Sequence, residues 1–397
     1  MRPVFCEITS WWNWYYIENQ ISPHFFYYPV QLMIEKGFDA EVLTTIDRSS
    51  EHQKGETISE HRENLQIYRF AGENPASLSM LMFSHILRKN YSLIHLHGAY
   101  WLSDFVSWIG SRVKKTPMVV TSHAHNSLER FMESKSRASI ARQRILEKWF
   151  VQDSPTCVFI AFTRTQAQVY RRLGISNIEI IPHGIDPKVF EVPSDPAILQ
   201  KYNLGEFNIL CVGATDLRKG QHLIVNGMPN IIREYPDTRL LIVGRSLSRY
   251  QREYLAMLKN QVRKLGLQRK VTFFDEISRD ELIQLYLASS VFALPTRAEM
   301  FGLIFLEAMG AGLPIVSTDR PYIKEILGDG EAGILVDRQK ESIENAILTL
   351  LGDESIRKKL GNNGKKLVRQ KYCLKDVVQK HWQLYQRVMA AAENSDR

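Results

Sequence analysis

Short apolar runs alternate with amphipathic stretches along the first half of the chain. Many of the runs are apolar without alternation, which is the pattern of parallel strands covered on both faces. They lie at residues 4–9, 40–45, 65–70, 93–96, 118–122, 157–162 and 178–181. Helical periodicity occupies several of the intervals, for example residues 25–36, 78–89 and 136–150. Strand and helix in alternation predict an α/β fold with a doubly wound sheet.

The same pattern starts again after a proline-bearing stretch. Residues 186–205 contain three prolines and few periodic apolar positions, so they predict a domain boundary. Further strands are predicted at 209–212, 240–243, 271–274, 292–294, 315–317 and 334–336. Helices are predicted at about 220–234, 249–265, 279–288, 303–310 and 339–351, and through a tail at 355–393 with a break near 372–374. We therefore expect two doubly wound domains, residues 1–190 and 205–372, with the active site in a cleft between them.

The composition changes this picture little. Among the 397 residues, 44% are hydrophobic and 24% are charged, which excludes a disordered chain. No run approaches the roughly 18 apolar residues that a membrane span needs, and Glu7 interrupts the apolar core that a signal peptide requires. The four cysteines, Cys6, Cys157, Cys211 and Cys373, form no CxxC pair. They predict buried reduced thiols in a reducing, cytoplasmic compartment rather than a metal site.

The net charge of +8 is concentrated in two segments. Residues 112–172 hold 12 basic and 4 acidic side chains, and residues 357–375 hold 8 basic and none acidic. Two interpretations stay open: solvated helix faces, or a surface for phosphate-bearing substrates, acidic lipid headgroups or nucleic acid. The basic, amphipathic helix predicted at 136–150 leaves the same choice between packing on its own sheet and peripheral membrane contact.

The most informative segment is TRAEMFGLIFLEAMGAGLPIVST, at residues 296–318. Glu299 and Glu307 are eight residues apart and would not share one face of a continuous helix. We therefore place Glu299 in a loop after the strand at 292–294, and Glu307 on the helix that follows. Backbone N–H groups at the start of that helix suit a phosphate, and a glycine there lets the ligand approach. The residues concerned are Phe301, Gly302 and Leu303.

A Glu, seven residues and a second Glu, with Phe-Gly between them and EAM-A-G-P-V after, resembles the signature of retaining glycosyltransferases of the GT-B fold, family 4. The resemblance covers most of the chain and is strongest over residues 181–336. It implies two Rossmann-like domains that face a central cleft, with the C-terminal helix at 375–397 returning to the first domain. It also implies a retaining reaction, usually described as same-face attack of the acceptor assisted by the leaving phosphate.

The segment VGATDLRKG, at residues 212–220, resembles the strand, loop and Lys-Gly motif of that family. Lys219 stands in the expected place, but Ala214 follows Gly213 where family members commonly carry an arginine. Arg218 is the candidate replacement. Two cations suit this place because the departing nucleoside diphosphate gains negative charge in the transition state. The alternative is that both are ordinary exposed cations of a loop.

The resemblance also implies the roles of the donor-site residues. Glu307 binds ribose hydroxyls, Glu299 binds and orients the donor sugar, and the backbone of Ile277 lies near the base. Arg218, Lys219 and the amides of residues 301–303 hold the diphosphate. The family works without an essential metal, and we expect no cofactor.

The first half offers weaker candidates. His123, at the end of the strand in VVTSHAHN, resembles the family histidine that faces the donor sugar. His97 in HLHG, at the end of another strand, is a weaker candidate on the acceptor side, and a structural imidazole is the alternative for either residue. Trp11, Trp12 and Trp14 stand where many members have a glycine-rich loop. These rings could stack on an acceptor sugar, lie at a membrane interface or pack in the core.

We expect a hexosyltransferase that moves a sugar from a nucleotide diphosphate sugar to a glycan or lipid-linked acceptor, as in polysaccharide or glycolipid synthesis. It would act in the cytoplasm, with peripheral contact to an anionic inner membrane face as a further possibility. The alternatives are an epimerase or a phosphorylase of the same fold. A basic nucleic-acid-binding protein is a third alternative, suggested by the isoelectric point of about 9.1, but no nucleic-acid motif supports it.

Overall fold

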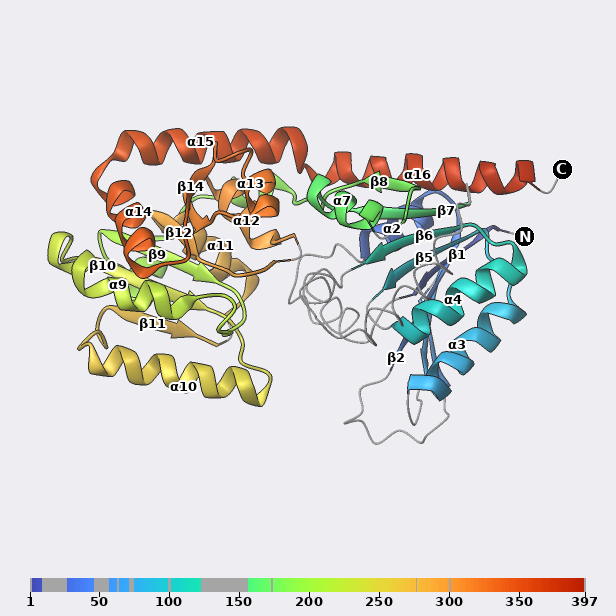
Figure 1. Ribbon diagram of the computed structural model, residues 1–397, viewed down its shortest axis with the longest axis horizontal. Helices are drawn as coiled ribbons and strands as arrows, with labels where there is room; N and C mark the ends of the chain where they lie inside the picture. Colours follow the sequence, from blue (N-terminus) through green and yellow to red (C-terminus); the bar gives the residue numbers. More distant parts are fainter. Residues whose placement is uncertain are drawn as a thin grey trace. The chain divides into compact units, whose positions relative to one another are not determined.

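The protein is described by a computed structural model (Figure 1). It describes residues 2–8, 27–45, 57–62, 64–70, 75–98, 101–122, 156–172, 174–275, 277–299 and 301–395. The chain divides into two compact units, Met1–Pro182 with Asp376–Arg397, and His183–Lys375. Residues 183–190, which the sequence places in the first domain, thus belong to the second unit, and the C-terminal segment belongs to the first.

The first unit holds an eight-stranded sheet in the order β3-β4-β2-β1-β5-β6-β7-β8. Neighbouring strands are parallel, except that β3 runs antiparallel to β4 at the edge. The strands are β1 (Val4–Ile8), β2 (Asp39–Thr45), β3 (Thr57–Arg62), β4 (Leu65–Phe70), β5 (Leu93–Gly98), β6 (Met118–Ser122), β7 (Cys157–Ala161) and β8 (Ile178–Ile180).

Helices cover both faces of this sheet. They are α2 (Tyr27–Glu35), α3 (Pro75–Arg88), α4 (Trp101–Lys114), α7 (Arg164–Arg172) and α16 (Leu374–Ser395). Met82 of α3 and Trp108 of α4 share a buried cluster with Cys6 of β1. The ring of Phe5, the residue of β1 just before Cys6, contacts the ring of Tyr385 of α16, with centroids 5.8 Å apart. Because successive side chains of a strand point to opposite faces, α16 covers the face opposite to α3 and α4 (Figure 1).

The second unit holds a six-stranded, wholly parallel sheet in the order β11-β10-β9-β12-β13-β14. Its strands are β9 (Phe207–Val212), β10 (Thr238–Val243), β11 (Val271–Phe274), β12 (Val291–Leu294), β13 (Ile315–Thr318) and β14 (Gly333–Val336). Its helices are η1 (Pro187–Phe190), α8 (Pro196–Lys201), α9 (Gln221–Glu234), α10 (Arg249–Lys264), α11 (Arg279–Leu287), α12 (Leu303–Ala311), α13 (Pro321–Ile326), α14 (Lys340–Gly352) and α15 (Glu354–Lys371).

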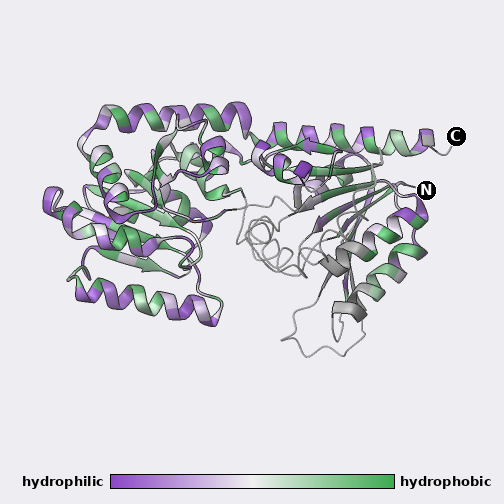
Figure 2. Ribbon diagram, in the orientation of Figure 1, coloured by the Kyte–Doolittle hydropathy of each residue, from purple (hydrophilic) through white to green (hydrophobic). Residues whose placement is uncertain are grey.

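Hydropathy explains why these segments form layers. In Figure 2 the strands of both units are mostly hydrophobic, whereas outer helices such as α10 and α15 show long hydrophilic faces. The predicted α/β class and the doubly wound pattern are therefore confirmed. The apolar pattern missed β3, whose sequence TISEHR has a single aliphatic residue, and the short α13. The predicted helix at 136–150 lies outside the described residues.

Candidate functional site

Two loops meet at the carboxyl edge of the second sheet. One follows β9 and leads into α9; the other follows β12 and leads into α12. β9 and β12 are hydrogen-bonded neighbours, although the chain first leaves β9 in the other direction, toward β10. This reversal of strand order is a topological switch point, where open α/β sheets bind their ligands. The sequence predicted both loops as site elements.

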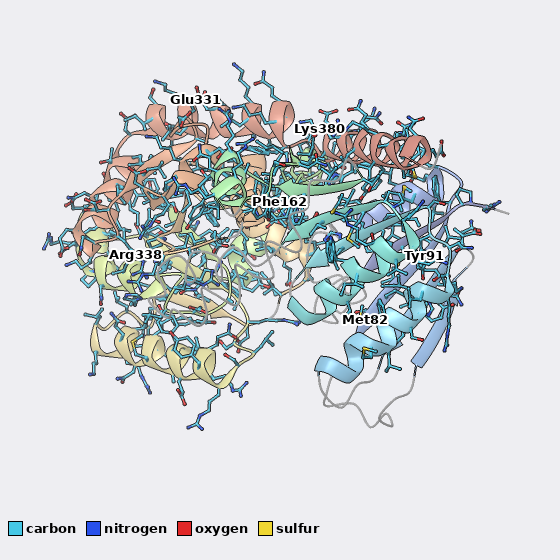
Figure 3. The ribbon with its side chains drawn as sticks, turned by 45° about the vertical axis from the view of Figure 1, so that its right-hand side comes forward. Met82, Tyr91, Phe162, Glu331, Arg338 and Lys380 are labelled. Carbon is cyan, nitrogen blue, oxygen red and sulfur yellow. The ribbon has the colours of Figure 1, made fainter. Side chains whose placement is uncertain are left out.

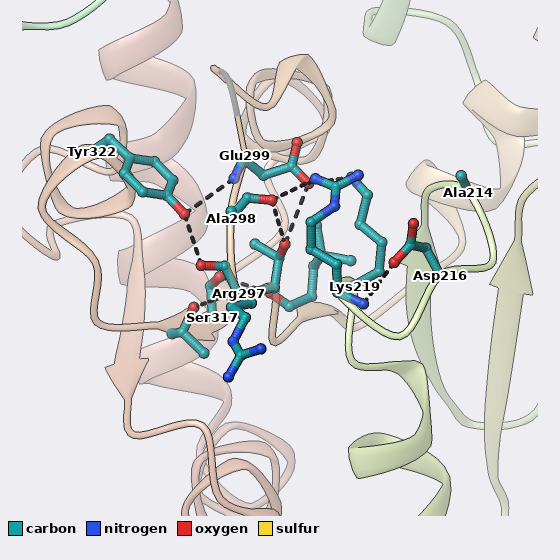
Figure 4. Close-up of polar contacts among 12 residues, drawn as sticks. Ala214, Asp216, Lys219, Arg297, Ala298, Glu299, Ser317 and Tyr322 are labelled. Carbon is teal, nitrogen blue, oxygen red and sulfur yellow. Dashed lines mark hydrogen bonds and ion pairs between the residues drawn. The ribbon is translucent and has the colours of Figure 1, made fainter. Parts of the chain in front are cut away.

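The centre of the site is a buried ion pair between the two loops (Figure 4). Lys219 Nζ contacts Oε1 of Glu299, and the two side chains are only 9% and 10% exposed. Arg218 lies beside them: its Nη1 donates to the carbonyl oxygen of Ala298 at 2.6 Å and stands 3.9 Å from the same Glu299 oxygen. The structure thus brings the adjacent predicted residues Arg218 and Lys219 together with the predicted Glu299, which is about eighty positions further along the sequence.

Neighbouring polar groups fix the carboxylate loop. The Glu299 backbone N–H donates to the Tyr322 hydroxyl at 3.1 Å, and the Thr296 hydroxyl donates to the Ala298 carbonyl at 3.0 Å. The two loops are also joined by their backbones: the Arg297 N–H donates to the Arg218 carbonyl at 2.7 Å. Thr296 and Tyr322 are both buried, and neither was predicted from the sequence as a site residue.

Gly213 provides room for the lysine. Its φ is +144°, which disfavours residues with a side chain, and a Cβ there would lie 3.4 Å from Cε of Lys219. Ala214 follows and cannot supply a cation. Its carbonyl accepts from Nε2 of Gln221, at the start of α9, at 3.0 Å. In this loop the cationic groups are those of Arg218 and Lys219.

The start of α12 lies next to the ion pair. Gly302 precedes the helix in the left-handed region, with φ +72°, and no side chain caps this end. A Cβ on Gly302 would stand 3.7 Å from Cγ of Glu299 and would clash at 2.6 Å with the ring of Phe305. Phe301 is buried, and Leu303 is the first helical residue. The backbone amides predicted to hold a phosphate therefore lie close to the pair.

Glu307 lies on α12, as predicted, but it already has partners. Its side chain is 3% exposed; Oε1 lies 2.7 Å from Nη1 of Arg279, and Oε2 accepts from the Tyr286 hydroxyl at 3.0 Å. Both partners belong to α11, whose first residue is Arg279 and whose cap is Ser278. Ile277 directly precedes that cap, so the fold brings it to the same helix start. The sequence analysis missed Arg279 and Tyr286.

In the first unit, His97 is buried rather than exposed to a ligand. Its Nε2 lies 3.2 Å from Oε1 of Glu7, and burial lowers the pKa of this imidazole to about 3 while it raises the pKa of Glu7. Glu7, His95 and His97 are a group whose ligand atoms could approach one metal ion. However, the two ring nitrogens of His95 already face Thr121 Oγ1 at 2.9 Å and the Tyr385 hydroxyl at 2.6 Å. The group is therefore better described as a buried hydrogen-bond network.

Several predicted features lie outside the described residues: His123, Trp11, Trp12, Trp14 and most of the basic segment 112–172. The second basic segment lies on α15, where Lys358 and Arg369 pair with the exposed carboxylates of Glu354 and Glu191. Among the helices that the structure describes, none combines the length and the apolar character of a membrane span. Membrane contact stays a prediction.

Two family models match the chain. The model described as Glycosyl transferases group 1 matches residues 196–367, and the model described as Glycosyltransferase Family 4 matches residues 26–189. Together they cover most of both units.

Individual proteins agree with these models. A D-inositol 3-phosphate glycosyltransferase of Corynebacterium glutamicum is 22% identical over 353 residues, which are 83% of each chain. The solved structure of a sucrose-phosphate synthase from Thermosynechococcus elongatus superposes with a TM-score of 0.76 at 24% identity, over 98% of this chain and 100% of that one. HepE of Anabaena, solved in complex with UDP-glucose, gives a TM-score of 0.73 at 17% identity, over 98% and 99%.

Proposed function

Because the chain belongs to the family 4 glycosyltransferases of the GT-B fold, we propose that it moves a sugar, with retention, from a UDP-sugar to a glycan or lipid-linked acceptor. That it is a nucleotide-sugar glycosyltransferase follows from the family. The choice of UDP is supported by the solved relative that holds UDP-glucose. The retaining course and the acceptor class rest on the sequence resemblance.

The buried Lys219–Glu299 pair is the observation that carries the donor-site proposal. A lysine that is 9% exposed needs a counter-charge, and Glu299 supplies it. When a diphosphate enters, its oxygens offer Lys219 a second anionic partner, and the Glu299 carboxylate can then accept hydrogen bonds from hydroxyls of the donor sugar. The ion pair therefore holds two donor-binding groups next to each other before the donor binds.

The diphosphate would lie between this pair and the start of α12. Lys219, Arg218 and the amides at Gly302 and Leu303 all offer donors there, so charge that develops on the leaving phosphate meets fixed cations and dipoles. We propose that these cations take the place of a metal ion. The same leaving phosphate would accept the proton of the attacking acceptor hydroxyl on the face where the new bond forms.

We propose that Glu307 binds the ribose diol, since a carboxylate can accept from two hydroxyls. Tyr286 already orients one of its oxygens, and Arg279 lies against the other. Because Arg279 is 34% exposed at its side chain, it can turn aside or share the carboxylate with ribose. His123 stays a proposed contact of the donor sugar.

Contact with an anionic membrane surface is a further part of the proposal, and it rests on the basic sequence segments alone. We expect the wild-type chain to bind vesicles containing an anionic lipid, and the triple change of Arg137, Arg142 and Arg144 to Glu to remove that binding. A wild type that binds no vesicles would end this part of the proposal without affecting the donor site.

Donor hydrolysis tests the function. UDP-, GDP- and ADP-glucose are each incubated with the protein without acceptor, and nucleoside diphosphate release is measured. We expect release from UDP-glucose, and its loss in Glu299→Ala. Release that depends on inorganic phosphate would favour a phosphorylase, and conversion of the sugar without release would favour an epimerase. No release from any donor, together with no affinity for nucleoside diphosphates, would refute the proposal.

A further inference from the structure

Three adjacent strands of the second sheet are each followed by an arginine, and the three arginines stand at equivalent positions in the strand register. β12 pairs with β13 through Leu294 and Ser317, and β13 pairs with β14 through Ser317 and Leu335. Three positions after each of these aligned residues stands an arginine. The three arginines, here called the arginine cluster, are Arg297, Arg320 and Arg338. Since the strands are parallel and in register, the cluster gathers at the carboxyl edge of the sheet, where α/β folds bind ligands.

The charges of Arg297 and Arg320 both act on Arg338. Burial, followed by the positive charges of Arg297 and Arg320, lowers the pKa of Arg338. Charges that affect one another in this way lie close together. Arg338 (Figure 3) is held in place by two hydrogen bonds, from Nε to the Pro295 carbonyl at 3.0 Å and from Nη2 to the Leu217 carbonyl at 2.8 Å. It therefore joins the two loops that carry the ion pair.

No carboxylate of the described residues forms an ion pair with the cluster. Asp319 and Asp337 directly precede two of the arginines in the sequence, but both are exposed and neither makes such a contact. The side chains of Arg297 and Arg320 are exposed. In Figure 4 the guanidinium of Arg297 points away from the Lys219–Glu299 pair. Within the part of the chain that the structure describes, the cluster is thus a separate concentration of positive charge with no carboxylate paired to it.

We propose that the arginine cluster binds a phosphate group, at a site separate from the diphosphate site at Lys219. Guanidinium groups present planar pairs of donors that match phosphate oxygens, and several of them around one anion form charge-assisted hydrogen bonds. Inorganic phosphate and the phosphate of a sugar phosphate share this chemistry. The inference goes beyond the donor site and stands whether or not the donor proposal holds.

Calorimetric titration with inorganic phosphate, in a buffer free of sulfate, tests the site. The titration is made in a Lys219→Ala background, which removes a cation from the diphosphate site, so that this site contributes less to the signal. We expect saturable binding in this background, and a loss of about ten-fold or more in affinity when Arg297→Gln or Arg320→Gln is added. Arg338 is left unchanged because it also holds the two loops together.

The matched control is Arg263→Gln, an exposed arginine near the end of α10, which should leave the affinity unchanged. Parallel titrations with glucose 6-phosphate and glucose identify the source of the phosphate. Tighter binding of glucose 6-phosphate than of phosphate would assign the site to a phosphorylated sugar, and equal binding would assign it to free phosphate. Absence of phosphate binding in both the wild type and the background, binding that only Lys219→Ala removes, or equal losses in the control would overturn the proposal.

Discussion

Replacing Lys219 by Met tests whether the buried ion pair is both a structural and a donor-binding element. Methionine keeps most of the apolar stem but removes the charge, which leaves the carboxylate of Glu299 buried. Removing one partner of a buried pair costs about 3–5 kcal/mol. Arg218, 3.9 Å away, remains as a partial partner, so we expect a loss near 3 kcal/mol. In a domain of this size that lowers Tm by about 6–12 °C.

The double variant Lys219→Met with Glu299→Gln separates the two roles. It removes both charges, so most of the lost stability should return, to within about 1 kcal/mol of wild type. Affinity for UDP should not return, because the charged hydrogen bond to the diphosphate is worth about 1.5–3 kcal/mol, or roughly 10- to 150-fold in Kd. Thermal denaturation and calorimetry measure the two effects on the same samples.

Lys358→Met is the matched control, because this lysine pairs with Glu354 on the surface, with side chains 70% and 66% exposed. Such pairs contribute little, so its Tm should stay near that of wild type. The reasoning is refuted if Lys219→Met melts within 1 °C of wild type, or if the double variant is less stable than either single change.

Three further predictions concern single positions. Hydrogen bonds from His85, Lys89 and Tyr91 outweigh burial and lower the pKa of Glu41 to about 2. The ionised carboxylate therefore stabilises the fold by about 3 kcal/mol above pH 4.5, and this stabilisation is lost as the pH falls toward 2. The difference in unfolding free energy between wild type and Glu41→Gln should be constant from pH 7 to about 5.5 and shrink at lower pH; an undiminished difference at pH 3.5 would contradict this. Arg279→Met should weaken UDP binding about ten-fold, since the Glu307 carboxylate loses the guanidinium that lies 2.7 Å from its Oε1 and holds it in place. Arg279→Lys should restore part of that affinity in the same titration. Gly302→Ala should cost about 1–2 kcal/mol in thermal denaturation because its φ is +72°; an unchanged Tm would show that this loop relaxes.

The sequence predicted the layered α/β fold and the residues of the Lys219 loop and the Glu299 loop, because buried parallel strands and helix starts leave local patterns. It did not predict Arg279 and Tyr286 beside Glu307. Those contacts come from the packing of α11 against α12, which no spacing along the chain reveals. Arg338 was missed for the same reason: its two acceptors, Leu217 and Pro295, lie on other loops.

Residues 186–205 contain helix-capping signals that could have been recognised in the sequence. Residues 186–205 were interpreted as a linker from their prolines. Two of those prolines follow an aspartate, at Asp186 and Asp195, and each aspartate caps a short helix whose first residue is the proline. Phe190 of η1 is buried, and its ring contacts the ring of Tyr286, with centroids 5.8 Å apart. The segment is therefore packed against the second unit, which is why the division falls before it.

The most direct test of the central claim is calorimetric titration of UDP against the wild type, Lys219→Ala and Glu307→Ala. The account predicts saturable binding in the wild type and an affinity at least ten-fold weaker in each variant, because one removes a cation from the diphosphate and the other removes the acceptor of the ribose hydroxyls. Unchanged affinity in both variants would contradict the assignment of the donor site to the switch point of the second sheet.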